Sequence, residues 1–231
     1  MKKLFHVHTF RCGHAEEVPD EEYIKRAIEL GAEGIWFTDH APFPGDLFGN
    51  RMLYAELPEY IDTLQALKEK YRQQLEVHIG LETEYFPAFD KAGYYRELRE
   101  NPGLENLILG QHMAEDVPGK YTYSWDKERL KAEEYLALGK AILQGMESGY
   151  FEVVAHPDRI YRRRKAWDDA MGQMAERIIA AAKKYDLPLE LNEAFKQRKN
   201  QYWEGFWNLA QGRVKMVRGL DAHSLEELKI L

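Results

Sequence analysis

The sequence has little cysteine and no long apolar run. Its 231 residues include one cysteine, which excludes an internal disulfide framework. No stretch is long and apolar enough to suggest a membrane-spanning helix, and the first residues lack the hydrophobic segment of a secretory signal. We therefore expect a cytoplasmic protein with no membrane partner.

The chain also lacks an excess of basic residues. Its 32 lysines and arginines are outnumbered by 39 aspartates and glutamates, which gives a formal net charge of -7. Proteins dedicated to nucleic acids usually carry a basic face, so no nucleic-acid partner is expected. A small phosphorylated substrate stays compatible with this charge, because a metal ion or a few arginines can supply positive charge locally.

No linker, low-complexity tract or repeat divides the chain, so residues 1–231 are expected to form a single domain. Short apolar runs alternate with helical patterns along its length. Strands are expected around residues 4–8, 34–38, 77–81, 107–110, 151–155, 187–191 and 215–220. Helices are expected around 20–30, with Asp20 as its cap, and around 57–73, 90–100, 126–148, 167–185 and 203–210.

Alternating strands and helices indicate an α/β protein with a parallel sheet and right-handed crossovers. An open, doubly wound sheet and a closed barrel both fit this alternation. Polar residues stand at the carboxyl ends of nearly all the strands, and they can converge on one point if the strands form a ring. This distribution favours a (β/α) barrel of seven units.

Histidine is concentrated where the expected strands end. His6 and His8 are two residues apart in a strand and therefore point to the same side, where they could hold one metal ion or be an ordinary histidine pair. Seven of the eight histidines lie at strand ends or in the first loop, and His78 inside the third strand is expected in the core or barrel wall. The candidate metal ligands are His6, His8, His14, His40, Glu82, His112, His156, Asp221 and His223. Nine such donors suit two to three divalent metal ions, whether zinc, manganese or iron.

These motifs, in this order, carry a family resemblance. The series that contains Thr38-Asp39-His40, Gly80-Leu81-Glu82, His156-Pro157-Asp158 and Asp221-Ala222-His223 resembles the PHP (polymerase and histidinol phosphatase) superfamily over nearly the whole chain. Cys12-Gly13-His14-Ala15 is most similar to the histidinol-phosphate phosphatases within it. The resemblance implies a distorted (β/α)7 barrel of the PHP type, with a trinuclear metal site at the C-terminal mouth of the strands.

The resemblance also implies how the ligands divide among the ions. The first ion would take His6, His8, Glu82 and Asp221, the second Glu82, His112 and His156, and the third His14, His40 and His223. Glu82 would bridge two ions, although Glu84 has the same parity near the same strand end and is the alternative. Cys12 is expected to be a small buried residue close to the metals.

The implied activity is metal-dependent hydrolysis of a phosphomonoester, in which two metals activate a bridging hydroxide. The leading expectation is an L-histidinol-phosphate phosphatase, which releases L-histidinol and phosphate in histidine biosynthesis. One alternative is a PHP phosphatase or phosphodiesterase that acts on nucleotides or nucleic-acid ends. Another is a non-catalytic PHP structural module, although such a module should have lost ligands, and here all nine positions are filled.

Asp39 and Glu82 are the candidate catalytic residues. Asp39 precedes a candidate ligand in the chain, so it could donate a proton to the leaving group or orient His40. Arg159 and Arg198 are candidates for holding the substrate phosphate, or they could pair with loop carboxylates. Glu190 is the candidate contact of the substrate amine.

Overall fold

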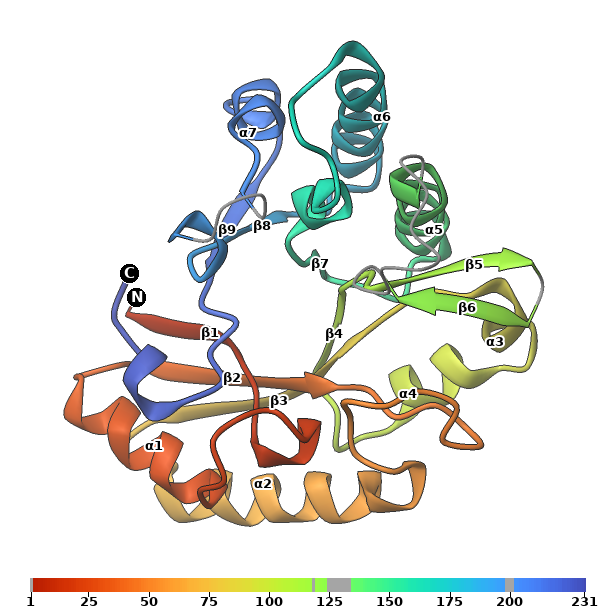
Figure 1. The fold of residues 1–231 in the computed structure, drawn as a ribbon. Helices are drawn as coiled ribbons and strands as arrows, with labels where there is room; N and C mark the ends of the chain where they lie inside the picture. The colour runs from red at the N-terminus through yellow and green to blue at the C-terminus, as the bar shows by residue number, and fades with distance from the viewer. Residues whose placement is uncertain (1, 118, 124–133, 198–201) are drawn as a thin grey trace. The chain divides into compact units, whose positions relative to one another are not determined.

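The computed structural model describes residues 2–117, 119–123, 134–197 and 202–231 (Figure 1). The strands are β1 (Lys3–Val7), β2 (Gly34–His40), β3 (Glu76–Thr83), β4 (Asn106–Leu109), β5 (Met113–Val117), β6 (Lys120–Tyr123), β7 (Val153–Val154), β8 (Leu189–Asn192) and β9 (Met216–Gly219). The α-helices are α1 (Asp20–Glu29), α2 (Leu57–Tyr71), α3 (Pro87–Lys91), α4 (Tyr94–Glu100), α5 (Glu134–Ser148), α6 (Asp169–Tyr185) and α7 (Glu204–Ala210). Short 3-10 helices are η1 (Phe10–Cys12), η2 (Tyr54–Glu56), η3 (Pro157–Tyr161), η4 (Phe195–Gln197) and η5 (Leu225–Glu227).

Seven of the strands form one sheet in the order β1-β2-β3-β4-β7-β8-β9. The chain that follows β9 returns to β1, where Leu220 N donates to Phe5 O and Val7 bridges Ala222 in parallel. The hydrogen bonds therefore run from strand to strand and back to the first. The expected fold class, a distorted (β/α)7 barrel, is confirmed.

The described residues divide into two compact units. The first comprises Met1–Glu82, Arg99–Leu107 and Arg218–Leu231, and the second comprises Thr83–Leu98 and Ile108–Val217. The strands β3, β4 and β9 contribute residues to both. That residues 1–231 act as a single domain stays a prediction.

In the first unit, α1 and α2 lie along β1, β2 and β3 (Figure 1). Tyr23, Ile24 and Ala27 form the buried stripe of α1, while acidic residues in its first turn suit the positive end of the helix dipole. The prediction that Asp20 caps this helix is wrong, because Pro19 occupies the cap position. The Asp20 carboxylate instead accepts hydrogen bonds of 2.7 and 2.8 Å from Arg11 Nη1, which replace the water lost on burial.

In the second unit, α6 packs between α5 and α7 (Figure 1). The single helix predicted over residues 90–100 is wrong at its start, because Gly93 has a φ of +90° and separates α3 from α4. The antiparallel hairpin β5–β6 was not predicted. The helix predicted from residue 126 is described from Glu134 onward, and residues 124–133 lie outside the described residues. Among the helices that the structure describes, none combines the length and the apolar character needed to cross a membrane.

Candidate metal centre

Two imidazoles at the end of β1 meet a carboxylate from the last part of the chain. His6 and His8 are fully buried. Backbone hydrogen bonds hold the segment after β9 in place, with Ala222 N donating to His6 O and His8 N donating to Ala222 O. Asp221 Oδ1 consequently lies 3.1 Å from His8 Nε2 and 3.6 Å from His6 Nε2. Three of the four residues predicted for the first ion therefore converge.

Glu82 lies at the centre of this group. It comes from the end of β3, and its Oε2 atom lies 3.5 Å from His6 Nε2, 3.6 Å from His8 Nε2 and 3.0 Å from His40 Nδ1. The side chain is almost fully buried. One carboxylate oxygen therefore faces three imidazoles, as expected of a carboxylate shared between ions.

His14, His40 and His223 form an adjoining group, whose ligand atoms all lie within 4.8 Å of one another. The Nδ1 atom of His14 is 2.9 Å from the carbonyl oxygen of Cys12, and the Nδ1 atom of His223 is 2.9 Å from that of Asp221. A carbonyl can only accept, so both rings carry their proton on Nδ1 when neutral, and Nε2 is the ligand atom. The structure thus groups the three residues predicted for the third ion.

The charges in this cluster favour a bound cation. Burial alone would lower the pKa of His8, but the carboxylates of Asp221 and Asp39 outweigh it and raise the pKa to about 9. Burial would raise the pKa of Asp221, but His6, His8 and His223 hold it well below its ordinary value. Burial, together with the nearby His8, lowers the pKa of His223 to about 4. Without a metal, the cluster therefore keeps a proton on His8 where a metal ion would supply positive charge.

The spacing of the donors also fits a metal ion. Two ligand atoms that each lie about 2.1 Å from an ion are about 3.0–3.4 Å apart at octahedral or tetrahedral angles. The nitrogen–oxygen distances around Glu82 and Asp221 range from 3.0 to 3.6 Å. Three buried nitrogens lack a partner with hydrogen-bond geometry among the described residues. They are both ring nitrogens of His8 and the Nε2 atom of His223. Buried polar atoms in this state are costly, and coordination would satisfy them.

Backbone strain marks the same residues. His6 has a φ of +68° and Asp221 a φ of +51°, in the left-handed region that L-residues with a Cβ avoid. His156, another predicted ligand, has a φ of +31°. Such strain persists where the surrounding structure imposes it, and it is typical of functional sites.

Asp39 contacts His8 and Thr9. Its Oδ1 atom lies 3.6 Å from His8 Nδ1, and both carboxylate oxygens accept from Thr9, whose backbone N lies 3.1 and 3.2 Å away and whose hydroxyl also donates. Asp39 is therefore placed to orient the His8 ring. Thr9 was missed, although its position directly after the histidine pair was the available signal.

In the second unit, His112 and His156 lie together, with ring centroids 5.1 Å apart. The Nδ1 atom of His112 is 3.0 Å from Glu84 Oε1, so the alternative bridging carboxylate is engaged in orienting this ring. Glu190 is fully buried and accepts a 3.0 Å hydrogen bond from His156 N. His112 and His156 follow β4 and β7, Glu84 follows β3, and Glu190 lies within β8.

Of the remaining predicted residues, Arg159 lies beside Phe195, with its guanidinium 5.8 Å from the ring centroid, and the Phe195 ring lies 5.3 Å from the His156 ring. Arg198 lies outside the described residues. The His78 ring stacks on Trp36 with centroids 4.1 Å apart, and its Nδ1 atom is 2.8 Å from Glu105 Oε2, so this histidine does not join the cluster.

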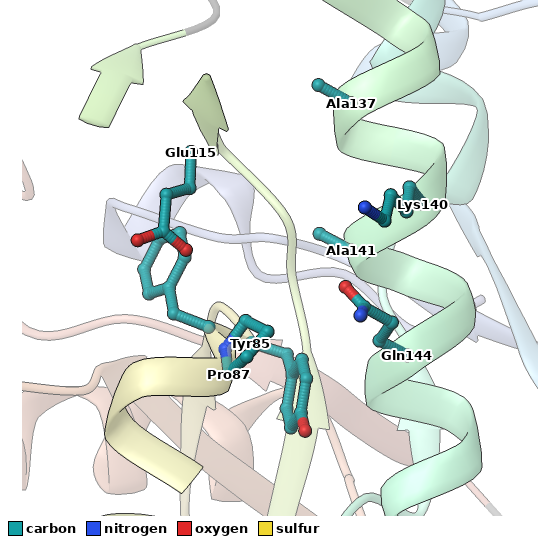
Figure 2. Close-up of a pocket in the computed structure, with 8 residues that line it drawn as sticks. Tyr85, Pro87, Glu115, Ala137, Lys140, Ala141 and Gln144 are labelled. Carbon is teal, nitrogen blue, oxygen red and sulfur yellow. The ribbon is translucent and has the colours of Figure 1, made fainter. Parts of the chain in front are cut away.

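A cavity of about 400 Å³ in the second unit contains none of the predicted site residues (Figure 2). Tyr85, Phe86 and Pro87 line one side, and residues of α5 such as Lys140 line the other. The candidate chemistry therefore resides in the histidine clusters and not in this cavity.

Seven parallel strands, with buried imidazole and carboxylate groups at the carboxyl ends of β1, β2 and β3, define a (β/α) barrel with a candidate metal centre. Residues 5–194 match the PHP domain family, and the chain belongs to this family.

Three known proteins illustrate the relationship. A protein of Deinococcus radiodurans, named as a probable histidinol-phosphatase, is 40% identical over 166 residues, which are 66% of this chain and 59% of that protein. The chain thus spans about three fifths of the length of this relative. The crystal structure of a Listeria monocytogenes protein assigned as a histidinol phosphatase superposes with a TM-score of 0.81 at 20% identity, covering 98% of this chain and 97% of that chain. A histidinol phosphate phosphatase of Lactococcus lactis, solved with zinc, L-histidinol and phosphate, gives a TM-score of 0.73 at 22% identity over 97% of this chain and 87% of that chain.

Proposed function

We propose that the chain is a metal-dependent phosphatase that hydrolyses L-histidinol phosphate to L-histidinol and phosphate. The observation that carries this proposal is the 40% identity to a relative named as a histidinol-phosphatase. The fold shared with a solved enzyme that holds zinc, L-histidinol and phosphate supports it. A role in histidine biosynthesis would place the chain in the cytoplasm.

The buried donors of the first unit support the metal requirement. His6, His8, Glu82 and Asp221 would hold one ion, and the group of His14, His40 and His223 would hold another. His112 and His156 are proposed to serve a third ion, the upper limit of the two to three ions expected. Divalent ions would supply an activated hydroxide at neutral pH and neutralise the charge that develops on the phosphate.

The protein groups around the metals would position the reactants. The carboxylate of Asp39 is held by Thr9 and faces His8, which favours a role in fixing that ring over a role as proton donor. Glu190 would fix the loop that carries His156 through the backbone N–H of that residue. Arg159 and Arg198 remain the proposed phosphate-binding residues, because a guanidinium can bind two phosphate oxygens at once.

The decisive experiment measures phosphate release by the metal-loaded protein from L-histidinol phosphate, a mononucleotide and an aryl phosphate at equal concentrations. Strong preference for L-histidinol phosphate is the expected result. Equal or greater activity on the mononucleotide would favour the nucleotide-directed alternative. An absence of activity on all three esters would favour a non-catalytic module.

Two variants of the same residue type test the site itself. His8→Ala should abolish phosphate release, whereas His78→Ala should leave it nearly unchanged, because His78 lies outside the cluster. Circular dichroism should show that both variants are folded. Full activity of His8→Ala would overturn the metal assignment.

A further inference from the structure

The cavity beside α5, called the α5 cavity below, contains none of the predicted metal ligands. Its volume of about 400 Å³ is within the range of small-molecule sites. Tyr85 and Phe86 form an aromatic wall, and the Tyr85 hydroxyl donates a 2.5 Å hydrogen bond to Asp90. On the other side, Ala137 and Ala141 leave space because their side chains are small (Figure 2). The α5 cavity can therefore hold a flat group against an aromatic surface.

Opposite charges face the α5 cavity from its two sides (Figure 2). Glu115 comes from β5, and its Oε1 atom accepts a 2.7 Å hydrogen bond from Gly119 N, which fixes the carboxylate. Lys140 and Gln144 come from α5. Among the residues that the structure describes, Lys140 forms no ion pair, either with Glu115 or with another carboxylate. Its charge is therefore available to an anionic group of a ligand, and that of Glu115 to a cationic group.

These features define the ligand by its chemistry. A molecule with separate ammonium and carboxylate groups can meet both charges, and a flat side chain can pack against Tyr85 and Phe86. An α-amino acid with an aromatic or heteroaromatic side chain has all three groups. A phosphate ester fits less well, because its two negative charges would lie beside Glu115 with a single lysine in the lining to balance them. The α5 cavity is thus suited to a ligand other than the phosphorylated substrate.

The aromatic wall of the α5 cavity is tied to a predicted metal ligand. The side-chain oxygen of Gln111 accepts from Tyr85 N at 2.9 Å, and its amide nitrogen donates to Tyr85 O at 3.4 Å and to Met113 O at 2.8 Å. The neighbours of Tyr85 and Gln111 in the chain are Glu84 and His112, whose side chains are 3.0 Å apart. A ligand packed on Tyr85 therefore contacts one of the two segments that orient the His112 ring.

We propose that the α5 cavity binds an α-amino acid with a flat side chain, and that the bound amino acid is coupled to the metal ligand His112 through Tyr85 and Gln111. The binding site is independent of the proposed function. The coupling rests on that function, because it assumes a metal ion at His112. By linkage, an amino acid that changes metal binding is itself bound with a different affinity when the metal is removed.

Calorimetric titration of the metal-loaded protein with L-phenylalanine tests the site. Two analogues each lack one charge: 2-phenylethylamine has no carboxylate, and 3-phenylpropanoate has no ammonium group. Both should bind about 10-fold more weakly than L-phenylalanine, because one charged hydrogen bond is lost. Lys140→Gln should weaken the binding of L-phenylalanine by about 10-fold and leave that of 2-phenylethylamine unchanged. Glu115→Gln should weaken the binding of L-phenylalanine equally and leave that of 3-phenylpropanoate unchanged.

Lys183→Gln is the matched control, because Lys183 is an exposed lysine on the adjacent helix α6. It should leave all three affinities unchanged. Ala141→Leu should prevent binding by filling the α5 cavity, and circular dichroism should show that this variant is folded. The proposal would be overturned if the unaltered protein did not bind L-phenylalanine. Equal losses for L-phenylalanine and 2-phenylethylamine in Lys140→Gln would also overturn it.

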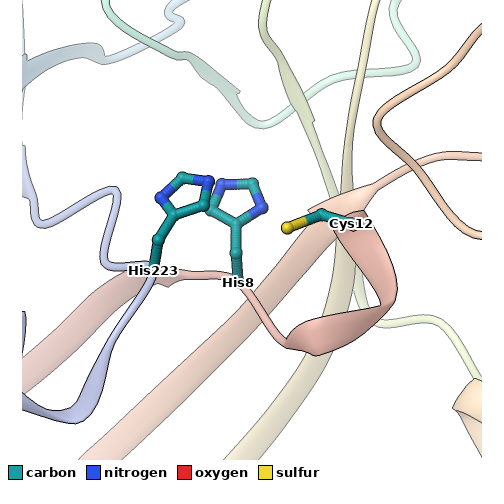
Figure 3. A group of neighbouring side chains, drawn as sticks. All are labelled: His8, Cys12 and His223. Carbon is teal, nitrogen blue, oxygen red and sulfur yellow. The ribbon is translucent and has the colours of Figure 1, made fainter. Parts of the chain in front are cut away.

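The metal centre is the competing place for an amino acid, because amino and carboxyl groups can coordinate a metal ion. Its donors in the first unit include His8 and His223, beside the buried Cys12 (Figure 3). Binding at those donors would be lost on removal of the metal and kept in Lys140→Gln. That result would overturn the proposal.

The same titration on the metal-free protein tests the coupling. The affinity for L-phenylalanine should differ by about 5-fold or more between the metal-loaded and the metal-free protein. Equal affinities would refute the coupling to His112. Neither measurement depends on phosphate release. A failure to hydrolyse L-histidinol phosphate would therefore refute the proposed function and leave the α5 cavity as an amino-acid site.

Discussion

Replacing His6 by glycine should leave a more stable protein than replacing it by alanine, the reverse of the usual order in a strand. The φ of His6 is +68°, and the pairing of β1 with β2 shifts register between Leu4 and Val7, around this residue. A left-handed backbone crowds a Cβ atom, which alanine has and glycine lacks. Because both variants remove the same imidazole, the loss of its contacts cancels from the comparison.

The magnitude follows from two opposing terms. The left-handed conformation costs a residue with a Cβ about 1–2 kcal/mol. The greater freedom of glycine in the unfolded chain costs about 0.4–1 kcal/mol. The glycine variant should therefore be more stable by about 1 kcal/mol, whereas in an ordinary strand alanine is favoured by about 0.5–1 kcal/mol.

Urea unfolding in the presence of a chelator measures this difference, because metal binding then contributes nothing to stability. His78 is the matched control: it is also a histidine, it lies in β3, and its φ is not positive. At position 78 the alanine variant should be the more stable of the pair. If alanine were also the more stable variant at position 6, the argument from strain at the metal ligands would be refuted.

Asp39→Asn keeps the shape of the side chain but removes the charge beside His8. Calorimetric titration should therefore show that the metal affinity is lower by about 10-fold or more. An unchanged metal affinity would mean that Asp39 does not act through His8. Gly80→Ala would place a Cβ 1.9 Å from Asn106 Oδ1, so urea unfolding should show a loss of about 1–3 kcal/mol. A loss below about 0.5 kcal/mol would mean that β3 and β4 can separate easily. Removing the metal with a chelator should lower the Tm. Zinc at about 100 times its Kd should raise the free energy of unfolding of the metal-free protein by about 2.7 kcal/mol. A Tm that does not change with the chelator would contradict a metal site that forms only in the folded protein.

Strand periodicity accounts for what could be predicted of the site. The alternation of side chains in β1 predicts that His6 and His8 face the same side, and both do contact Glu82. The same rule, applied to β2, places Asp39 and His40 on opposite faces, which agrees with the contact between Asp39 and His8. The contact of Asp39 with Thr9 lies outside such a rule, because it joins two separate segments of the chain.

The hairpin β5–β6 shows where periodicity failed. A turn dipeptide, Pro118-Gly119, stands between its strands in the sequence and was a usable signal. The strands have five and four residues, too few for a clear alternation of apolar and polar side chains. The break before α4 was also missed, because a single glycine within a helical pattern does not reveal whether its φ will be positive.

The contacts between β1 and the segment after β9, called the seam below, affect the order of folding. Beyond the ring-closing hydrogen bonds, Leu225 N donates to Glu16 Oε2 across 209 residues of chain. Closing a loop of that length costs about 5 kcal/mol of chain entropy, so contacts at this seam should form late. During synthesis, the histidines of β1 leave the ribosome long before Asp221 does. Until Asp221 has been made, the edge of β1 that pairs with the end of the chain has no partner strand. A metal ion in this cluster would fasten the earliest part of the chain to the latest, and amide hydrogen exchange after its removal should therefore begin at the seam.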